Sequence, residues 1–430
     1  MAASAIRPCL VLADAQGNIY DDPELLMVCR HGAQFALPRP DELMPLPRES
    51  ELFLLPGRKA LGLDAESGQL LEGDGLAVAA FAAPAHTLTA HPAYATEPNA
   101  PMLPLFAYGA VGFAKGRFYV CAKKVDDDQR QVFQGISPAL VKKKALALMK
   151  RFPENRLIQH LAGQCALVYA CPAARNFCLG RYEAPLPVSR SCNARCIGCI
   201  SQQGEDSPVC ATPQKRMGFT PTAEEIVEVM EVHAANESAA PIFSFGQGCE
   251  GEPLTKADLL TEAVSLYRSR RGVGSINLNS NASMPKAVAR LAEAGLSSLR
   301  VSLNSARPEV YERYYRPLDY DFEKVRQSIA LAKKAGLFVS LNLLYFPGFS
   351  DTEEECEALS RLVGEHAVDM IQLRNLNIDP EYYLELMQDV ESGPLLGFHN
   401  FRKRLKKDNP HLRFGYFNPF VAQRLLSDDN

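Results

Sequence analysis

The sequence lacks the features that would assign it to a membrane, to secretion or to nucleic acid. Its longest apolar stretch, near residues 76–85, is far shorter than the ~20 residues that a membrane-spanning helix needs. Residues 1–18 carry one arginine and a short apolar run broken by Asp14, which makes a poor signal peptide. The 46 basic and 50 acidic residues nearly cancel, so no overall field attracts the chain to a polyanion. We therefore expect a cytoplasmic protein, with neither a membrane nor a nucleic acid as its partner.

Cysteine is abundant, and a chain without a secretion signal is expected to keep its 12 cysteines reduced or bound to metal. Cys192, Cys196 and Cys199 follow a Cys-x3-Cys-x2-Cys spacing. Three close thiolates without a close fourth suggest a four-iron cluster whose last iron is open to a small molecule. Three buried core thiols are an alternative that this tight spacing disfavours. A zinc site is the stronger rival, and it would need a fourth ligand such as Cys210 or His233.

The chain changes character near residue 180. Residues 1–180 predict a β-rich N-terminal domain of unknown role, with a hairpin turn at 114–116 and a helix at 139–151. Helices and apolar strands then alternate, and a capping signature at Thr222–Glu225 opens the first of these helices. With a first strand before Cys192, six β/α units predict an α/β fold of the partial (β/α)6, TIM-like barrel type. We expect the barrel over residues 184–390, and over 391–430 a C-terminal extension that packs on it. The strands are expected at 241–245, 275–279, 299–303, 338–344 and 370–376.

Polar residues stand at the expected C-terminal end of each strand after the cysteine loop. Taken singly, an asparagine at such a place is as often a turn or a helix cap. Because the carboxyl ends of parallel strands meet at one edge, the set predicts a polar ring at the mouth of the barrel. These segments are 246–253, 279–281, 302–305, 342 with 347–348, and 374–377.

With these motifs in place, residues 184–380 resemble the radical S-adenosylmethionine (SAM) superfamily, nearest to its branch of molybdenum-cofactor cyclases and peptide-maturing enzymes. The resemblance implies that Cys192, Cys196 and Cys199 bind a [4Fe-4S] cluster. It also implies SAM contacts from the segment that resembles the family's Gly-Gly-Glu-Pro motif and from later strand ends. These positions are Gly251, Glu252, Pro253, Asn281, Ser302, Asn304 and Asn342.

The same resemblance implies the chemistry. SAM would be cleaved reductively at the cluster to a 5′-deoxyadenosyl radical, which would abstract hydrogen from a peptide, a nucleotide or a small metabolite. Such an enzyme is oxygen-sensitive and needs a low-potential electron donor, a flavodoxin or a ferredoxin.

Two positions depart from the family pattern. Gly198 stands where the family usually has an aromatic residue before the third cysteine, so adenine packing would come from elsewhere, with Ile197 or Ile200 as candidates. Glu250 replaces the first glycine of the Gly-Gly-Glu-Pro motif and would face substrate or solvent. Cys249 and Glu250 are the weak candidates for a catalytic role, Cys249 as a hydrogen donor.

Other readings stay open. A non-catalytic iron–sulfur or zinc-binding protein would use the three cysteines structurally and supply a fourth ligand. An RNA-modifying enzyme would use the basic segment 401–407, although a solvated helix face is the simpler interpretation. An auxiliary cluster is a further option, although apolar neighbours favour core packing for its cysteines. Its ligands would be Cys165, Cys171, Cys178 and Cys210.

Overall fold

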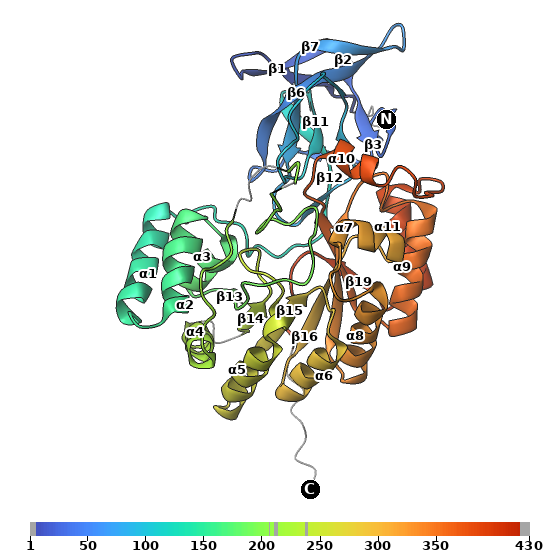
Figure 1. The fold of residues 1–430 in the computed structure, drawn as a ribbon. Coiled ribbons are helices and arrows are strands. Elements are labelled where there is room, and N and C mark those ends of the chain that lie inside the picture. Colours follow the sequence, from blue (N-terminus) through green and yellow to red (C-terminus); the bar gives the residue numbers. More distant parts are fainter. Residues whose placement is uncertain (1–5, 206, 210–213, 237–239, 422–430) are drawn as a thin grey trace.

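The computed structural model describes residues 6–421 except 206, 210–213 and 237–239. Its N-terminal part is an antiparallel sheet of nine strands in the order β10-β6-β2-β1-β7-β11-β12-β5, with β8 beside β12 (Figure 1). A small sheet of order β4-β3-β9 lies beside it. The strands of the large sheet are β1 (Cys9–Ala13), β2 (Ile19–Met27), β5 (Leu43–Pro45), β6 (Glu51–Asp64), β7 (Leu70–Phe81), β8 (His86–Leu88), β10 (Tyr94–Thr96), β11 (Gly109–Ala114) and β12 (Arg117–Lys124). Those of the small sheet are β3 (Cys29–His31), β4 (Gln34–Ala36) and β9 (His91–Pro92).

The predicted hairpin joins β11 to β12. Lys115 and Gly116 form its two-residue turn, and both have positive φ angles, 48° and 74°. Two positive φ angles are what a tight hairpin turn requires, because its twist then matches that of the strands. The alternating apolar pattern and the turn sequence therefore both predict the hairpin that the structure shows.

A helical segment follows, formed by α1 (Pro138–Arg151), α2 (Arg156–Gln159), the π-helix η1 (His160–Val168) and α3 (Pro172–Leu179). The helix expected at 139–151 is confirmed by α1. Leu157 and Phe177 of this segment share one apolar core with Phe243 and Leu260 of the following part of the chain. The helical segment thus packs on the parallel sheet. The domain boundaries at 180 and 390 remain predictions.

The C-terminal half is a parallel sheet whose strands follow sequence order, with helices along its outer side (Figure 1). All the expected strands are present: β13 (Glu183–Leu186), β14 (Ile242–Phe245), β15 (Ser275–Ser280), β16 (Ser298–Leu303), β17 (Phe338–Tyr345) and β18 (Met370–Asn375). A seventh, β19 (Arg413–Gly415), pairs with β18, so the described sheet has one strand more than the six expected. In the described residues β13 and β19 are the two ends of the sheet, which makes it an open, partial barrel.

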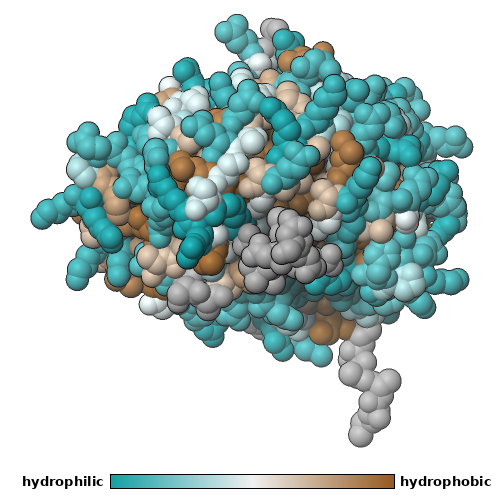
Figure 2. Space-filling view, turned by 90° about the horizontal axis from the view of Figure 1, so that it is seen from below, coloured by the Kyte–Doolittle hydropathy of each residue, from teal (hydrophilic) through white to brown (hydrophobic). Residues whose placement is uncertain are grey.

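The helices between these strands are α4 (Ala223–Asn236), the short 3-10 helix η2 (Pro253–Lys256), α5 (Ala257–Ser269), α6 (Pro285–Ala294), α7 (Pro308–Tyr315), α8 (Phe322–Lys334), α9 (Glu353–His366), α10 (Pro380–Leu386) and α11 (Gly397–Asp408). The capping box before α4 is confirmed. Thr222 N donates to the Glu225 carboxylate at 2.8 Å, and Glu225 N donates to Thr222 Oγ1 at 3.2 Å. No helix of the described residues combines the length and apolar character needed to cross a membrane. The face shown in Figure 2 is mostly hydrophilic, with small apolar patches.

The N-terminal sheet contacts the parallel sheet at the carboxyl ends of β17 and β18. The buried Arg58 Nη2 lies 3.0 Å from Asp379 Oδ2, just beyond β18. The Asn375 side chain joins β8 by accepting from Leu88 N at 2.8 Å and donating to His86 O at 3.1 Å. The antiparallel sheet therefore covers one side of the edge at which the polar strand ends meet.

Candidate metal centre

One cavity of about 330 Å³ lies at this edge of the parallel sheet and collects almost every predicted site residue. Its walls come from the loop after β13 and from the carboxyl ends of β14 to β18. The predicted residues that line it are Cys192, Cys196, Cys199, Glu250, Gly251, Glu252, Pro253, Asn281, Ser302 and Asn342. The polar ring predicted from the sequence is thus a single cavity wall.

The three cysteines stand on one short loop held against α7. Ile197 N donates to Tyr314 O at 3.0 Å, and Cys199 N donates to Cys196 O at 3.2 Å. Burial raises the pKa of Cys196, and the neighbouring Cys199 and Cys192 raise it further. Three thiols of this kind release their protons most readily to a cation that all three bind together.

Cys199 differs from the other two cysteines. Burial alone would raise its pKa, but hydrogen bonds from Ser201 and Gln202 and the charge of Arg216 outweigh that effect and lower it. Arg216 Nη2 lies 4.0 Å from Cys199 Sγ, and its Nε donates to Ser201 Oγ at 3.1 Å. The loop therefore holds one thiol ready to ionise.

Within the described residues, the three thiolates of this cavity fit a cluster with one open iron. His233 does not line the cavity, and its Nε2 lies 3.2 Å from Tyr182 O in the core. Cys210, the other expected fourth ligand, is outside the described residues. Thiolate ligands suit iron–sulfur clusters, and an open coordination position suits a bound small molecule.

Three residues that line the same cavity have a buried polar atom without a hydrogen-bond partner among the described residues. Arg300 Nε, Tyr315 Oη and Asn342 Oδ1 are buried, belong to lining residues, and have no hydrogen-bond partner within the described part of the chain. Buried polar groups are normally paired, so unpaired ones beside a cavity point to a polar occupant. Thiolates at one wall and unpaired polar atoms at another fit a cluster with a polar cofactor such as SAM.

Glu252 links three of the walls. Its carboxylate accepts from Ser280 Oγ at 2.6 Å, Asn281 N at 2.9 Å and Leu254 N at 3.0 Å. Its own N–H donates to Ser191 O at 2.9 Å, next to Cys192. Burial outweighs the hydrogen bonds and raises its pKa to about 6. A cation placed beside this carboxylate would stabilise its charged form.

Glu250 neither faces solvent nor presents a free carboxylate to the cavity. One carboxylate oxygen accepts from Val188 N and Ser189 N, at 2.7 and 2.9 Å. The other accepts from Gly246 N and Gln247 N, at 2.9 and 2.8 Å. Glu250 therefore joins the chain before the cysteine loop to the loop after β14, and its placement favours a positioning role over a catalytic one.

The aromatic residue missing at Gly198 is supplied by α7. A Cβ at position 198 would collide with Tyr314 Oη, and Tyr314 Cζ would be 3.2 Å from it. Tyr314 lines the cavity together with Ile200, whereas Ile197 is buried outside the lining. Tyr314 thus fills the space beside Gly198.

Three other expected site residues differ in how they lie relative to the cavity. Asn304 is fully buried outside the lining, and its Nδ2 donates to Val310 O at 3.3 Å and Tyr383 Oη at 3.4 Å. It holds α7 rather than facing the cavity. Cys249 also lies outside the lining, on the far side of its loop. Asn281 lines the cavity, but its side chain is engaged by Asn193 and by Ser283 N.

Arg300, a cation inside the apolar strand β16, lies in the wall of the cofactor cavity. Burial, and then the nearby charge of Arg374, lower the pKa of Arg300 to about 9. Both arginines also line an adjoining cavity of about 290 Å³ that shares the loop after β14 with the first. Arg313, by contrast, pairs with Asp389 outside either cavity. The two adjoining arginines form a cationic wall.

The basic segment 401–407 lies on α11, and much of its charge is engaged within the protein. Arg404 pairs with Glu353 and Glu357, both at 2.8 Å, and Lys406 Nζ donates to Leu412 O. The Arg402 guanidinium lies over two aromatic rings. This favours the packed helix face over an RNA-binding surface.

Comparison with known proteins agrees with this geometry. Residues 186–360 match the family described as the Radical SAM superfamily. A GTP 3′,8-cyclase of Streptomyces coelicolor is 26% identical over 223 residues, which are 50% of this chain and 60% of that protein. One of Peptoclostridium acidaminophilum is 30% identical over 187 residues, 43% of this chain and 52% of that protein. The chain thus spans little more than half the length of these curated relatives.

A crystal structure of HydG, a maturase of the [FeFe]-hydrogenase, matches at a TM-score of 0.38 and 16% identity, over 66% of this chain and 64% of that one. A score this low supports no inference about the present chain.

Proposed function

We propose that the chain, whose residues 186–360 match the radical SAM superfamily, is an enzyme with a [4Fe-4S] cluster and SAM as cofactors, and that it abstracts hydrogen from a small anionic substrate. A nucleotide is the leading candidate. The single observation that carries the proposal is the cavity that brings three thiols, a buried carboxylate and unpaired polar atoms together beside two arginines.

Cys192, Cys196 and Cys199 would hold the cluster, and Glu252 would meet the amino group of SAM. When bound, the cluster and SAM supply an electron and a carbon radical that removes a hydrogen atom. A low-potential donor, a flavodoxin or a ferredoxin, would provide the electron.

The residues that line the cavity would bind and orient SAM and the substrate. Ser302 and Asn342 are neighbours in the register of β16 and β17, so they present polar groups side by side at the strand ends. Tyr314 and Tyr315 contribute aromatic surface to the same cavity. The antiparallel sheet covers one side of the mouth and would limit the entry of water.

The cationic wall supports an anionic substrate. Arg300 donates to Gln372 Oε1 at 3.2 Å and has an unpaired buried Nε. Arg374 stacks on Tyr416, 3.8 Å from the ring centroid. The two adjacent arginines repel one another, and Glu183 in the same cavity offsets part of this repulsion. Guanidinium groups bind phosphate and carboxylate well, so a further anion would be stabilised beside them. The GTP 3′,8-cyclase relatives make a nucleoside triphosphate the first compound to try.

The test is anaerobic reconstitution with iron and sulfide, followed by dithionite and SAM. We expect 5′-deoxyadenosine from the wild type and none from Cys196→Ser. Cys356→Ser is the matched control, because this buried thiol lies on α9 away from the cavity. A fully assembled cluster that yields no 5′-deoxyadenosine would refute radical chemistry.

Substrate class is tested by adding nucleoside triphosphates, small carboxylates and neutral analogues, and by following the stimulation of 5′-deoxyadenosine formation. Removing one charge-assisted contact costs about 1.5–3 kcal/mol, so Arg374→Gln is expected to raise KM for an anion about 10- to 100-fold. Equal stimulation by neutral analogues, or an unchanged KM, would contradict the anionic subsite.

A further inference from the structure

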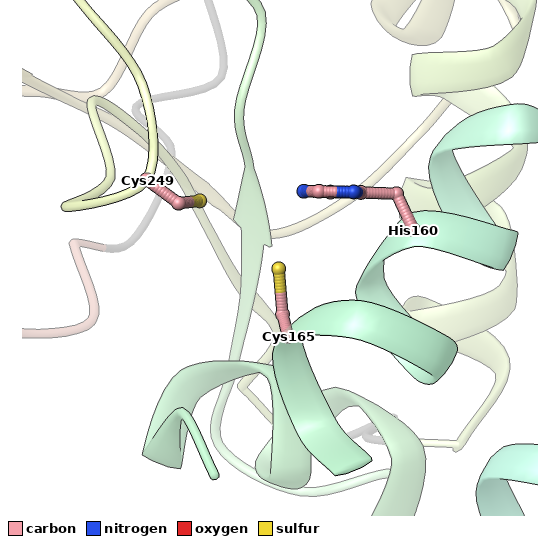
Figure 3. Close-up of side chains that lie close together, drawn as sticks. All are labelled: His160, Cys165 and Cys249. Carbon is pink, nitrogen blue, oxygen red and sulfur yellow. The ribbon is translucent and has the colours of Figure 1, made fainter. Parts of the chain in front are cut away.

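A second group of metal-binding side chains lies outside the cofactor cavity. His160, Cys165 and Cys249 converge on one point, with their ligand atoms all within 4.8 Å of one another (Figure 3). His160 and Cys165 come from η1, and Cys249 comes from the loop after β14. Neither the cluster nor SAM requires these residues.

The π-helical form of η1 is what brings His160 and Cys165 together. On an α-helix of 3.6 residues per turn, residues five apart point about 140° away from each other. A π-helix joins residue i to i+5, so two such residues lie nearly above one another. A nine-residue π-helix is rare, and short π segments occur frequently at functional sites.

The ligand atoms are buried, and the His160 side chain interacts with the Cys249 thiol. Cys165 and Cys249 are 2% and 6% exposed. His160 Nε2 is buried and makes no hydrogen bond of ordinary geometry with the described residues, and its ring points toward the two sulfurs. A buried imidazole nitrogen is normally paired. Aimed at two thiols, it points to a cation between them.

We propose that His160, Cys165 and Cys249 bind one zinc ion. Nitrogen and thiolate sulfur are the ligands that zinc prefers, at about 2.0–2.1 and 2.3 Å. Tetrahedral ligands at those distances lie about 3.5–3.8 Å apart, and the three ligand atoms all lie within 4.8 Å of one another. Cys171 is the candidate for a fourth ligand, because its N–H donates to Cys165 O at 2.9 Å, but its sulfur is not part of the converging group, and water is the alternative.

The other group of this kind does not support a metal. Cys29, His31 and Glu42 also have ligand atoms within 4.8 Å. Here His31 Nε2 lies 2.8 Å from the Glu42 carboxylate, which also accepts from Arg39 N at 2.9 Å. The Cys29 thiol donates to Ala36 O at 3.3 Å. Each ligand is already paired, so this group serves as an internal comparison.

A zinc ion at this site would fix the position of the loop that carries Gly251 and Glu252. Cys249 stands two residues before Gly251, and the ion would tie it to η1. The ion would therefore stabilise the loop without entering the cofactor cavity. This inference does not depend on the proposed function.

The test uses the full chain in a background where Cys192, Cys196 and Cys199 are replaced by serine, so that the cluster site cannot bind the added metal. After loading with Zn²⁺ alone and dialysis, elemental analysis is expected to find one zinc per chain. The double variant Cys165→Ser/Cys249→Ser is expected to bind none. Cys356→Ser and His31→Ala are the matched controls and should keep the zinc. Cys171→Ser shows whether the fourth ligand is this thiol or water.

Cobalt gives an independent readout in the parent background. Co²⁺ at the site is expected to show thiolate-to-metal charge-transfer absorption, which His160→Ala shifts and the double variant abolishes. If the double variant does not fold, the cobalt spectrum of the parent chain decides whether thiolates bind the metal. A parent chain that binds no zinc, or cobalt without thiolate absorption, overturns the proposal, as does zinc retained in a folded double variant. Because no cluster is present, this result is separate from any result on SAM cleavage.

Discussion

Replacing Glu250 by glutamine separates a positioning role from a catalytic one. The Glu250 carboxylate accepts four backbone N–H groups, two on each oxygen, from residues 188–189 and 246–247. A carboxamide keeps one oxygen and presents N–H groups to the other pair of donors. Two buried N–H groups therefore lose their acceptor.

The magnitude follows from the cost of a buried donor without a partner. That cost is about 1–3 kcal/mol for each group, so two groups give about 2–6 kcal/mol. Burial raises the pKa of Glu250 to about 7, which shows that its charge is itself costly, and this places the expected loss in the lower half of the range. At about 2–4 °C per kcal/mol, the melting temperature should fall by roughly 5–15 °C.

The assay is differential scanning calorimetry of the cluster-free full chain, with iron content after reconstitution measured in parallel. We expect Glu250→Gln to melt early and to retain less iron, because the chain before the cysteine loop is no longer held. The exposed Glu66→Gln is the control and should shift stability by less than about 0.5 kcal/mol. A Glu250→Gln protein with unchanged melting and iron content that makes no 5′-deoxyadenosine would refute the positioning role.

Three further outcomes are expected. Gly198→Ala should lower the free energy of unfolding by about 1–3 kcal/mol, because the added methyl group crowds Tyr314 Oη. Adding Tyr314→Phe should restore the melting temperature; no recovery would contradict the close packing of Tyr314 against Gly198. Asp379→Asn should cost about 3–5 kcal/mol, because it leaves Arg58 buried and unpaired, and limited proteolysis should cut the N-terminal sheet faster. Burial disfavours the Glu225 carboxylate, but hydrogen bonds from Arg156 and Thr222 N outweigh burial and lower its pKa to about 2. Its stabilising effect is thus complete above the unfolded pKa of about 4.3 and lost as pH falls toward 2, so the melting difference between wild type and Glu225→Gln should shrink over that range.

The strands and the polar cavity wall were predictable because their signals are local. Apolar runs of strand length alternate with capped helices, and parallel strands must bring their carboxyl ends to one edge. The cysteine spacing and Glu252 needed no contact information beyond this topology. The same reasoning placed Asn304 in the ring, and it failed there because the residue turns into the core under α7.

The features that escaped sequence reasoning depend on contacts between distant segments. No periodicity shows that Tyr314 fills the space beside Gly198, since the two are brought together by α7 and not by spacing. The π-helical turn of η1 is also invisible to a pattern of 3.6 residues, so His160 and Cys165 look unrelated in the sequence. The short strand β19 joins the sheet through only three residues.

The loop between β14 and α5 explains why so many of these distant contacts matter for one site. Its N-terminal N–H groups bind the Glu250 carboxylate, Cys249 turns toward η1, and Gly251 N donates to Ser189 O at 2.8 Å. A Cβ on Gly251 would collide with Ser191 O, so only glycine lets the loop lie this close to the chain before Cys192. The cysteine loop itself has little regular structure, and its position is therefore set by neighbours on either side: α7 through Tyr314 and this loop through Glu250. An open iron can accept a cofactor reproducibly only if such a loop is held, and the four backbone N–H groups on the Glu250 carboxylate join the chain before the cysteine loop to the loop after β14.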